Sequence, residues 1–428
     1  MPIFFRCACV DATRASRQVR PKFRDVRFGS FLAGEMVNSI GGWASAIVLW
    51  GFAAYRFNAS SYAVSITIIC WAAPSALLSP VMGVCVDRLN PKNALIVGYL
   101  ASAGAALGMA ASGSLAELDI AAFPYGITRS ITGPAASALP PRIVASDDLL
   151  AANSMLGAAA STGQVVGPLA ASLALALSGF QAAFVFDAAS YLVGVLAILP
   201  LPLLAVPAQE RSRWRRETIE GIVLVARSRA LRFVVLISAA VTFSSGAFLV
   251  VEPLYARHVL HRPPSQFALF EAAAGAGAIL AGLTIPRLRR LEGKKILAGG
   301  AIGYGLTACL FVGTTSVPVA YVGAFTWGVS GAVFYAVAII TLQKLAPVHA
   351  HGRIMGVTVT IGSAADTVAL PTAGLALAVL GIRAGAIALA AVTIATGTIC
   401  LAADTARPTD GLSNGANEDK DSSPSTLG

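Results

Sequence analysis

Four charged side chains lie inside long apolar stretches of the 428-residue sequence, namely Glu35, Arg129, Glu271 and Asp366. A charge inside hydrocarbon is costly, so a residue of this kind usually faces a cavity or a partner and takes part in function. A carboxyl group that alternates between an apolar environment and the neighbourhood of a cation takes up a proton in one and releases it in the other. All four are therefore candidates for proton coupling or substrate binding. The alternative is a static buried ion pair that only fixes helix packing.

Other side chains add to this set of candidates. At helical spacing, Glu35 shares one face with Asn38 and Gly42. Asp187 and Glu252 lie nearer the ends of their apolar stretches and are weaker candidates. Several aromatic residues either line an apolar cavity for a bulky substrate or face lipid. These are Trp43, Trp50, Tyr125, Tyr304, Phe325, Trp327 and Tyr335.

The composition predicts that membrane-spanning helices position these residues. The sequence is 56% hydrophobic and 12% charged, with a mean hydropathy of +0.73, whereas a soluble domain carries about 25% charged residues. This excludes an ordinary soluble enzyme, a coiled coil and a disordered chain. A spanning helix needs about 20 apolar residues, and twelve stretches reach that length. Their approximate limits are 28–55, 62–84, 93–112, 119–141, 150–178, 182–204, 231–255, 265–285, 296–314, 317–342, 354–379 and 382–402.

The distribution of basic residues predicts the orientation of the chain in the cell (inner) membrane. If the N-terminus is cytoplasmic, 26 of the 31 Lys and Arg residues fall in cytoplasmic segments and 4 in external ones. Cytoplasmic loops carry the excess of Lys and Arg, so both termini are expected inside. The same bias explains the net charge of +10, and we expect the lipid bilayer rather than nucleic acid as the partner of these charges.

A basic segment divides the spans into two groups of six. The predicted units are a cytoplasmic tail (1–27), an N-terminal half (28–204), a cytoplasmic linker (205–230), a C-terminal half (231–402) and a disordered cytoplasmic tail (403–428). The halves echo each other, since GVCVDRL at 83–89 is followed 199 residues later by GLTIPRL at 282–288. Such repeats at matching offsets are typical of secondary transporters built from two parallel halves.

The loop after the second span carries a charged motif. Its candidate residues are Gly83, Asp87, Arg88 and Lys92. The segment resembles the loop signature of the major facilitator superfamily, which reads roughly G-x-x-x-D-R-x-G-R-K. Asn90 and Pro91 replace the usual glycine and basic residue, and asparagine tolerates a left-handed turn. The resemblance implies that Asp87 and Arg88 form an inner latch that closes one side of the transporter.

The fifth span carries a second motif, with Gly163, Gly167 and Pro168. It resembles the G-x-x-x-G-P-x-x-G-G element of exporting, proton-antiporting members of that superfamily, with Ala171 and Ser172 at the last two glycines. Small residues four apart allow close contact between helices, and the proline bends the helix.

Further segments resemble the exporter branch that includes enterobactin and macrolide efflux proteins. They are LPPR at 139–142, LLAAN at 149–153, Glu220-Gly221 and GRIMG at 352–356. Many exporters of this branch carry an acidic residue directly after the glycine that corresponds to Gly41, where this chain has Gly42. Glu35, about two turns nearer the cytoplasm, is the expected substitute.

The resemblance implies an all-α fold of twelve transmembrane helices in two six-helix halves, with the first, fourth, seventh and tenth spans around a central cavity. It implies export of a bulky, partly apolar small molecule of drug, macrolide or siderophore type, by proton antiport and alternating access. The alternatives are a proton-coupled uptake carrier of the same fold and a non-transporting sensor or binding member. The sequence has no ATP-binding loop and no arrangement of nucleophile and base. We therefore expect no enzyme, no catalytic residue, no cofactor and no metal site. We also expect a monomer.

Overall fold

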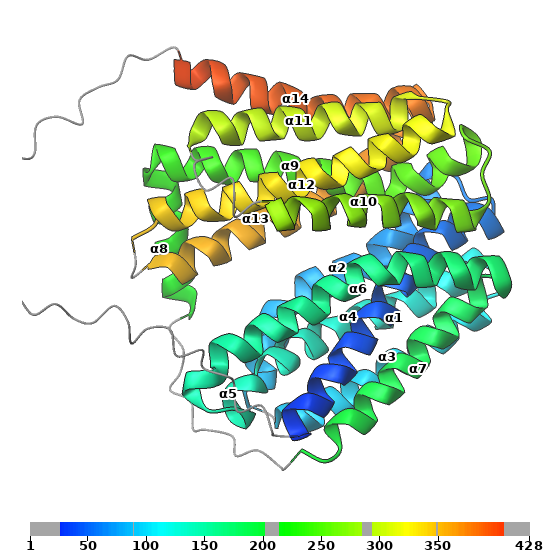
Figure 1. Ribbon diagram of the computed structural model, residues 1–428, viewed down its shortest axis with the longest axis vertical. Helices are drawn as coiled ribbons and strands as arrows, with labels where there is room; N and C mark the ends of the chain where they lie inside the picture. Colours follow the sequence, from blue (N-terminus) through cyan, green and yellow to red (C-terminus); the bar gives the residue numbers. More distant parts are fainter. Residues whose placement is uncertain (1–25, 89, 202–213, 285–292, 348–349, 406–428) are drawn as a thin grey trace, which may run out of the picture.

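The computed structural model describes residues 26–88, 90–201, 214–284, 293–347 and 350–405 (Figure 1). The first group of helices comprises α1 (Val26–Arg56), α2 (Ser61–Arg88), α3 (Pro91–Ala111), α4 (Leu115–Ser137), α5 (Pro140–Ile143), α6 (Leu149–Leu177) and α7 (Phe180–Ile198), with one 3-10 turn at Ser146–Asp148. The second group comprises α8 (Trp214–Arg227), α9 (Arg229–His258), α10 (Pro264–Thr284), α11 (Lys294–Gly313), α12 (Val317–Leu345), α13 (His351–Leu380) and α14 (Ile382–Thr405). Most of both predicted tails lies outside the described residues.

The long helices form two bundles with the same internal pairing (Figure 1). In the first bundle, α1 packs on α6 and α7, α2 on α4, and α3 on α4 and α7. In the second bundle, α9 packs on α13 and α14, α10 on α12, and α11 on α12 and α14. The helices therefore correspond in order, α1 to α9 and α6 to α13, so that one six-helix unit occurs twice.

Eleven of the described helices are long and apolar enough to cross a membrane. The helix α4 is not among them, and it carries Glu117, Asp119 and Arg129. Its 23 residues still extend for about 34 Å, and it packs between α2 and α3 as a twelfth long helix. It begins four residues before the predicted stretch 119–141, because the Ser114 hydroxyl accepts a hydrogen bond from the Glu117 amide and caps the helix there.

Small residues allow the helices to approach closely. A Cβ atom at Gly277 of α10 would lie 3.0 Å from the carbonyl carbon of Phe325 in α12, and one at Gly328 of α12 would lie 2.6 Å from that of Ala274 in α10. These two glycines face each other's helix, so the α10–α12 crossing depends on the absence of side chains on both.

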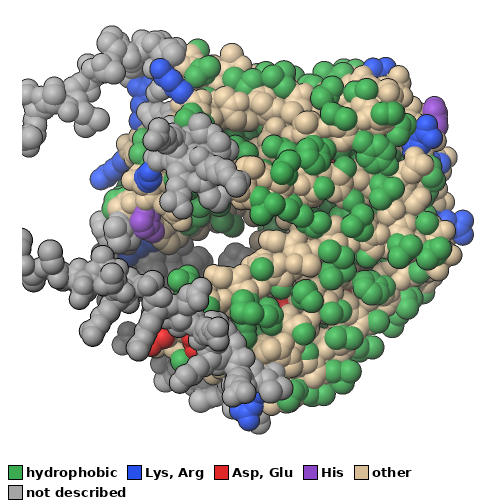
Figure 2. Space-filling view, viewed as in Figure 1, with side chains coloured by type: hydrophobic (Ala, Val, Ile, Leu, Met, Phe, Trp, Pro, Cys, Tyr) green, Lys and Arg blue, Asp and Glu red, His purple; other side chains and the backbone are tan. Residues whose placement is uncertain are grey.

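The two bundles meet at one end of their long helices. This end is opposite to the side on which the described chain begins and finishes. The Ser61 hydroxyl, at the start of α2, donates a 2.9 Å hydrogen bond to the Gly374 carbonyl in α13. The helix α6 also packs against α10. On the side where α1 begins and α14 ends, the space-filling view shows a hollow between the bundles (Figure 2). The hollow therefore opens on the side where the described chain begins and ends.

Candidate functional site

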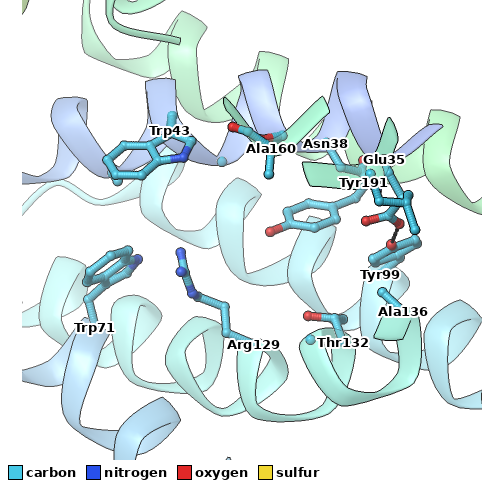
Figure 3. A pocket seen from close by; sticks show the side chains of 15 residues that line it. Glu35, Asn38, Trp43, Trp71, Tyr99, Arg129, Thr132, Ala136, Ala160 and Tyr191 are labelled. Atoms are coloured by element: carbon cyan, nitrogen blue, oxygen red, sulfur yellow. Dashed lines mark hydrogen bonds between the residues drawn. The ribbon is translucent and has the colours of Figure 1, made fainter. Parts of the chain in front are cut away.

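A cavity of about 430 Å³ lies within the first bundle (Figure 3). Six helices supply its wall: α1, α2, α3, α4, α6 and α7. Its polar and aromatic lining residues are Glu35, Asn38, Ser39, Trp43, Trp71, Tyr99, Arg129, Thr132 and Tyr191. The cavity thus joins one carboxylate, one guanidinium and two indoles inside a membrane-spanning bundle.

Glu35 enters this cavity from α1 and is held by α3. The Tyr99 hydroxyl donates a hydrogen bond to Glu35 Oε1 (Figure 3). Asn38, one turn further along α1, is buried against Gly194 of α7, where any side chain would collide with the Asn38 amide. Gly42 also lines the cavity, and apart from neighbouring atoms of α1 itself no heavy atom lies within 4 Å of the position that its Cβ would occupy. The polar face of α1 expected from helical spacing therefore faces one common space.

Arg129 reaches the same cavity from α4. Its guanidinium carbon lies 4.6 Å from the ring centre of Trp71, a cation–π contact (Figure 3). No acidic side chain in the described ranges lies within ion-pair distance of Arg129. The guanidinium is exposed to the cavity. An arginine in this position offers planar donors to a ligand that brings its own acceptor.

The other two charged candidates lie elsewhere. Asp366 of α13 packs against Gly246 of α9, where a Cβ atom would lie 2.6 Å from Asp366 Oδ1. Glu271 of α10 faces the carboxyl group of Glu252 in α9, which is buried. The structure therefore brings Glu35 and Arg129 into one cavity and places Asp366 and Glu271 in the second bundle.

A buried polar cluster that the sequence ranks low lies directly behind the cavity. The Tyr125 hydroxyl donates a 2.8 Å hydrogen bond to Asp187 Oδ2 and lies 3.0 Å from the Tyr191 hydroxyl. Asp187 is fully buried. The sequence signal that could have found it is Asp187 and Tyr191, four residues apart and therefore on one face of the sixth span.

The aromatic residues expected around a cavity divide between the two bundles. Trp43 lines the cavity of the first bundle, together with Trp71. Trp327 of the second bundle stacks on Phe248 with ring centres 5.2 Å apart and lies 5.4 Å from Tyr304. In the second bundle these aromatic rings pack on each other.

The glycines of the fifth-span motif lie where α6 crosses α1. A Cβ atom at Gly163 would lie 2.5 Å from the carbonyl carbon of Ser39, and one at Gly167 would lie 3.1 Å from the Ala44 amide nitrogen. Pro168 is buried in the same helix. This motif therefore brings α6 against the part of α1 that carries the cavity residues.

The loop motif is described only in part. Gly83, Asp87 and Arg88 belong to the last turns of α2, and their side chains lie outside the described ones. Lys92, in the first turn of α3, donates hydrogen bonds to the carbonyl of Leu199, at 2.8 Å, and to that of Leu201. It thereby satisfies carbonyls at the end of α7 in its own bundle.

Asn90 does not adopt the left-handed conformation that asparagine tolerates. Its φ is −71° and its ψ is 117°, an extended conformation. Its side-chain oxygen accepts a 3.1 Å hydrogen bond from the Lys92 amide. The residue is extended because it caps the N-terminus of α3, and an N-cap residue has non-helical, extended dihedrals.

Two segments that resemble the exporter branch meet near the end of the second bundle. The Arg353 guanidinium of α13 lies 2.8 Å from Glu220 Oε2 of α8, and both side chains are half-buried. At the neighbouring Gly221, a Cβ atom would lie 2.9 Å from the Arg353 carbonyl oxygen. The helix α8, which lies within the predicted linker, is thus tied to α13.

The model of the Major Facilitator Superfamily matches residues 31–370 and 234–426, and the chain belongs to this family. The chain is 22% identical over 377 residues to macrolide efflux protein A of Streptococcus pyogenes, covering 83% of this chain and 91% of that protein. It is 25% identical over 355 residues to the multidrug efflux pump Tap of Mycolicibacterium fortuitum, covering 77% and 84%. A solved POT family transporter in complex with a thioalcohol-conjugated peptide superposes with a TM-score of 0.72 at 13% identity, covering 89% of this chain and 96% of that one.

These comparisons confirm the predicted all-α membrane fold in two halves and the resemblance to the exporter branch. The chain is a multi-pass membrane transporter that handles small molecules, and it is not an enzyme.

Proposed function

We propose that this chain exports a bulky, partly apolar small molecule of drug, macrolide or siderophore type from the cytoplasm in exchange for protons. The observation that carries the proposal is the cavity of the first bundle, where Glu35, Arg129 and two indoles face one space of about 430 Å³. Indole faces bind apolar and aromatic groups, and the two charges fix the orientation of a polar group on the same molecule.

The hollow between the bundles is the route by which substrate enters in this proposal. With both termini in the cytoplasm of the cell membrane, the hollow on the side of the chain ends opens to the cytoplasm. Substrate then enters from inside, and closure of that side with opening of the other releases it outside. The names of the efflux relatives favour the same direction.

In this proposal, the exchange of substrate for protons arises because the two compete for Glu35. The Tyr99 hydroxyl donates to Glu35 Oε1, so that the carboxylate acts as an acceptor in this arrangement. A substrate group beside Glu35 and a proton on Glu35 exclude each other. The empty carrier then returns with the proton, and the two movements run in opposite directions.

The remaining elements have supporting roles in this proposal. Asp87 and Arg88 latch the cytoplasmic side, with Gly83 allowing close approach, while Gly163, Gly167 and Pro168 hold α6 on α1. Asp366 and Glu271 serve the second half, either in coupling or as packing groups. The linker 205–230 connects the two halves, 28–204 and 231–402, and one chain suffices for transport.

The test uses inside-out membrane vesicles from an efflux-deficient host that expresses the chain. A proton gradient is imposed, and a pH-sensitive dye is followed while macrolides, cationic dyes and siderophores are added in turn. We expect proton movement with one compound class, lost in Glu35→Gln and retained in Asp147→Asn, since Asp147 is an exposed loop carboxylate.

Two outcomes contradict the proposal. One is the absence of a response to any class by an inserted, folded chain. The other is accumulation of substrate in right-side-out vesicles together with protons, which indicates an uptake carrier. Within the first outcome, binding of a compound without counterflow in vesicles indicates a sensor.

A further inference from the structure

Among the side chains that the structure describes, the most deeply buried acidic group of the first bundle takes no part in the site described above. Asp187 of α7 is 0% exposed. Its Oδ2 accepts the 2.8 Å hydrogen bond from Tyr125, and its Oδ1 lies 3.5 Å from the Ser190 hydroxyl. In the described part of the chain no basic side chain lies within ion-pair distance of it. An ionised carboxyl group is costly to bury without a cation beside it, so a carboxyl group in this position inside a membrane bundle is a candidate for proton binding.

The surroundings of Asp187 come from three helices. The titratable and polar groups that face it are Ser45 of α1, Tyr125 and Arg129 of α4, and Ser190 and Tyr191 of its own helix α7. The backbone of α1 closes the remaining side, because a Cβ atom at Gly41 would lie 3.0 Å from Asp187 Oδ1. Asp187 is therefore surrounded by groups from α1, α4 and α7.

A line of hydroxyl groups connects this carboxyl group to the cavity. Tyr125 bonds Asp187 and lies 3.0 Å from the Tyr191 hydroxyl, and Tyr191 lines the cavity wall. The rings of Tyr191 and Tyr99 have centres 5.6 Å apart, and Tyr99 bonds Glu35 (Figure 3). A tyrosine hydroxyl both donates and accepts a hydrogen bond, so each link can pass a proton to the next.

We infer that Asp187 is a second proton-binding site of the transporter, and that it exchanges its proton with the cavity through Tyr125 and Tyr191. Uptake of one proton by Asp187 takes place in three proton transfers. Asp187 takes the proton of Tyr125, Tyr125 takes that of Tyr191, and Tyr191 takes one from a hydronium ion in the cavity, which leaves a water molecule. Release runs in the opposite order. This inference rests on the proposed proton exchange and adds a carboxyl group to it.

The test reads protonation directly, apart from transport. Infrared difference spectra of the full chain in proteoliposomes, recorded while the pH is changed, show the carbonyl stretch of protonated carboxyl groups. We expect Asp187→Asn to remove one component of that band. Tyr125→Phe and Tyr191→Phe are both expected to retain this component. Its frequency shifts in Tyr125→Phe, and in both variants it appears more slowly after a pH jump. Tyr62→Phe, at an exposed residue of α2, is the matched control and leaves band and rate unchanged.

The outcomes separate this inference from the proposed function. An unchanged band in a folded Asp187→Asn variant overturns the inference, and proton exchange at Glu35 then stands alone. Loss of the component in Asp187→Asn with wild-type rates in both Phe variants overturns the route through the tyrosines. If no compound moves protons but the component is lost in Asp187→Asn, the proposed exchange fails while the site at Asp187 is retained.

Discussion

Gly41 and Gly42 are adjacent in α1, and their surroundings predict opposite effects of substitution by alanine on the free energy of unfolding. At Gly41, the Cβ atom of alanine would lie 2.8 Å from Ser190 Cβ and 3.0 Å from Asp187 Oδ1, with Ser190 Oγ closer still. At Gly42, apart from neighbouring atoms of α1 itself, no heavy atom lies within 4 Å of the Cβ position, because the position faces the cavity. Ordinary van der Waals contact begins at about 3.4 Å, so Gly41→Ala forces α1 and α7 apart by about half an ångström.

The magnitude follows from two opposing terms. Replacing glycine by alanine inside a helix stabilises it by about 1 kcal/mol, and this term applies equally at both positions. Overpacking a well-filled contact costs about 1–3 kcal/mol, and this term applies only at Gly41. We therefore expect Gly42→Ala to raise the free energy of unfolding by about 1 kcal/mol, and Gly41→Ala to fall below Gly42→Ala by about 1–3 kcal/mol.

The assay is the midpoint temperature at which the detergent-solubilised chain is lost from its monodisperse peak in fluorescence-detected size-exclusion chromatography. Wild type, Gly41→Ala and Gly42→Ala are heated in parallel. The expected order of midpoints is Gly42→Ala above wild type, and Gly41→Ala lowest or equal to wild type. A midpoint for Gly41→Ala at or above that of Gly42→Ala would refute the close packing of α1 on α7 and the position of Gly42 on the cavity.

Three further substitutions test other contacts. Gly163→Ala should lower the midpoint temperature and impair transport, because the new Cβ atom collides with the α1 backbone. Gly157→Ala, on the same helix with open space around it, should do neither. Equal midpoints for the two variants would contradict the α1–α6 crossing. Lys92→Met removes the donors to two carbonyls beyond α7 and should cost about 1 kcal/mol in thermal unfolding; an unchanged midpoint would show that water replaces the lysine. Arg353→Gln breaks the half-buried pair with Glu220 and should cost less than about 1 kcal/mol, an effect that decreases as salt is added; a salt-independent loss would indicate a packing role instead.

The fold is predictable from the sequence because its determinants are local. Each span needs an apolar run of a given length, and these runs are visible one at a time. Among the helix starts, the largest shift is at α4, which begins at Leu115 under the Ser114 cap rather than at 119, because three charged side chains interrupt its apolar pattern. Among the helix ends, the largest is at α7, which ends at Ile198 rather than at 204. A cap acts through one hydrogen bond, which hydropathy does not record.

The site is predictable only as a set of candidates. Glu35, Arg129, Asp366 and Glu271 have the same signature in the sequence, yet only Glu35 and Arg129 line the described cavity. Contacts between helices distant in sequence decide this, such as Tyr99 of α3 on Glu35 of α1. Asp187 ranks low in the sequence because it lies nearer a span end, and its burial depends on how α1, α4 and α7 pack around it.

The repeated pairing of helices has a consequence for how this transporter diversifies. Two copies of one six-helix unit differ in how they pack, since Glu35 and Arg129 line an open space in the first unit, whereas Trp327 stacks on Phe248 and lies near Tyr304 in the second. In the first unit the indoles and the charges share one space, so a substitution there alters both which molecules fit and how they are coupled to protons. Adaptation to new compounds is therefore expected to appear around the cavity of the first unit and to carry a cost in coupling.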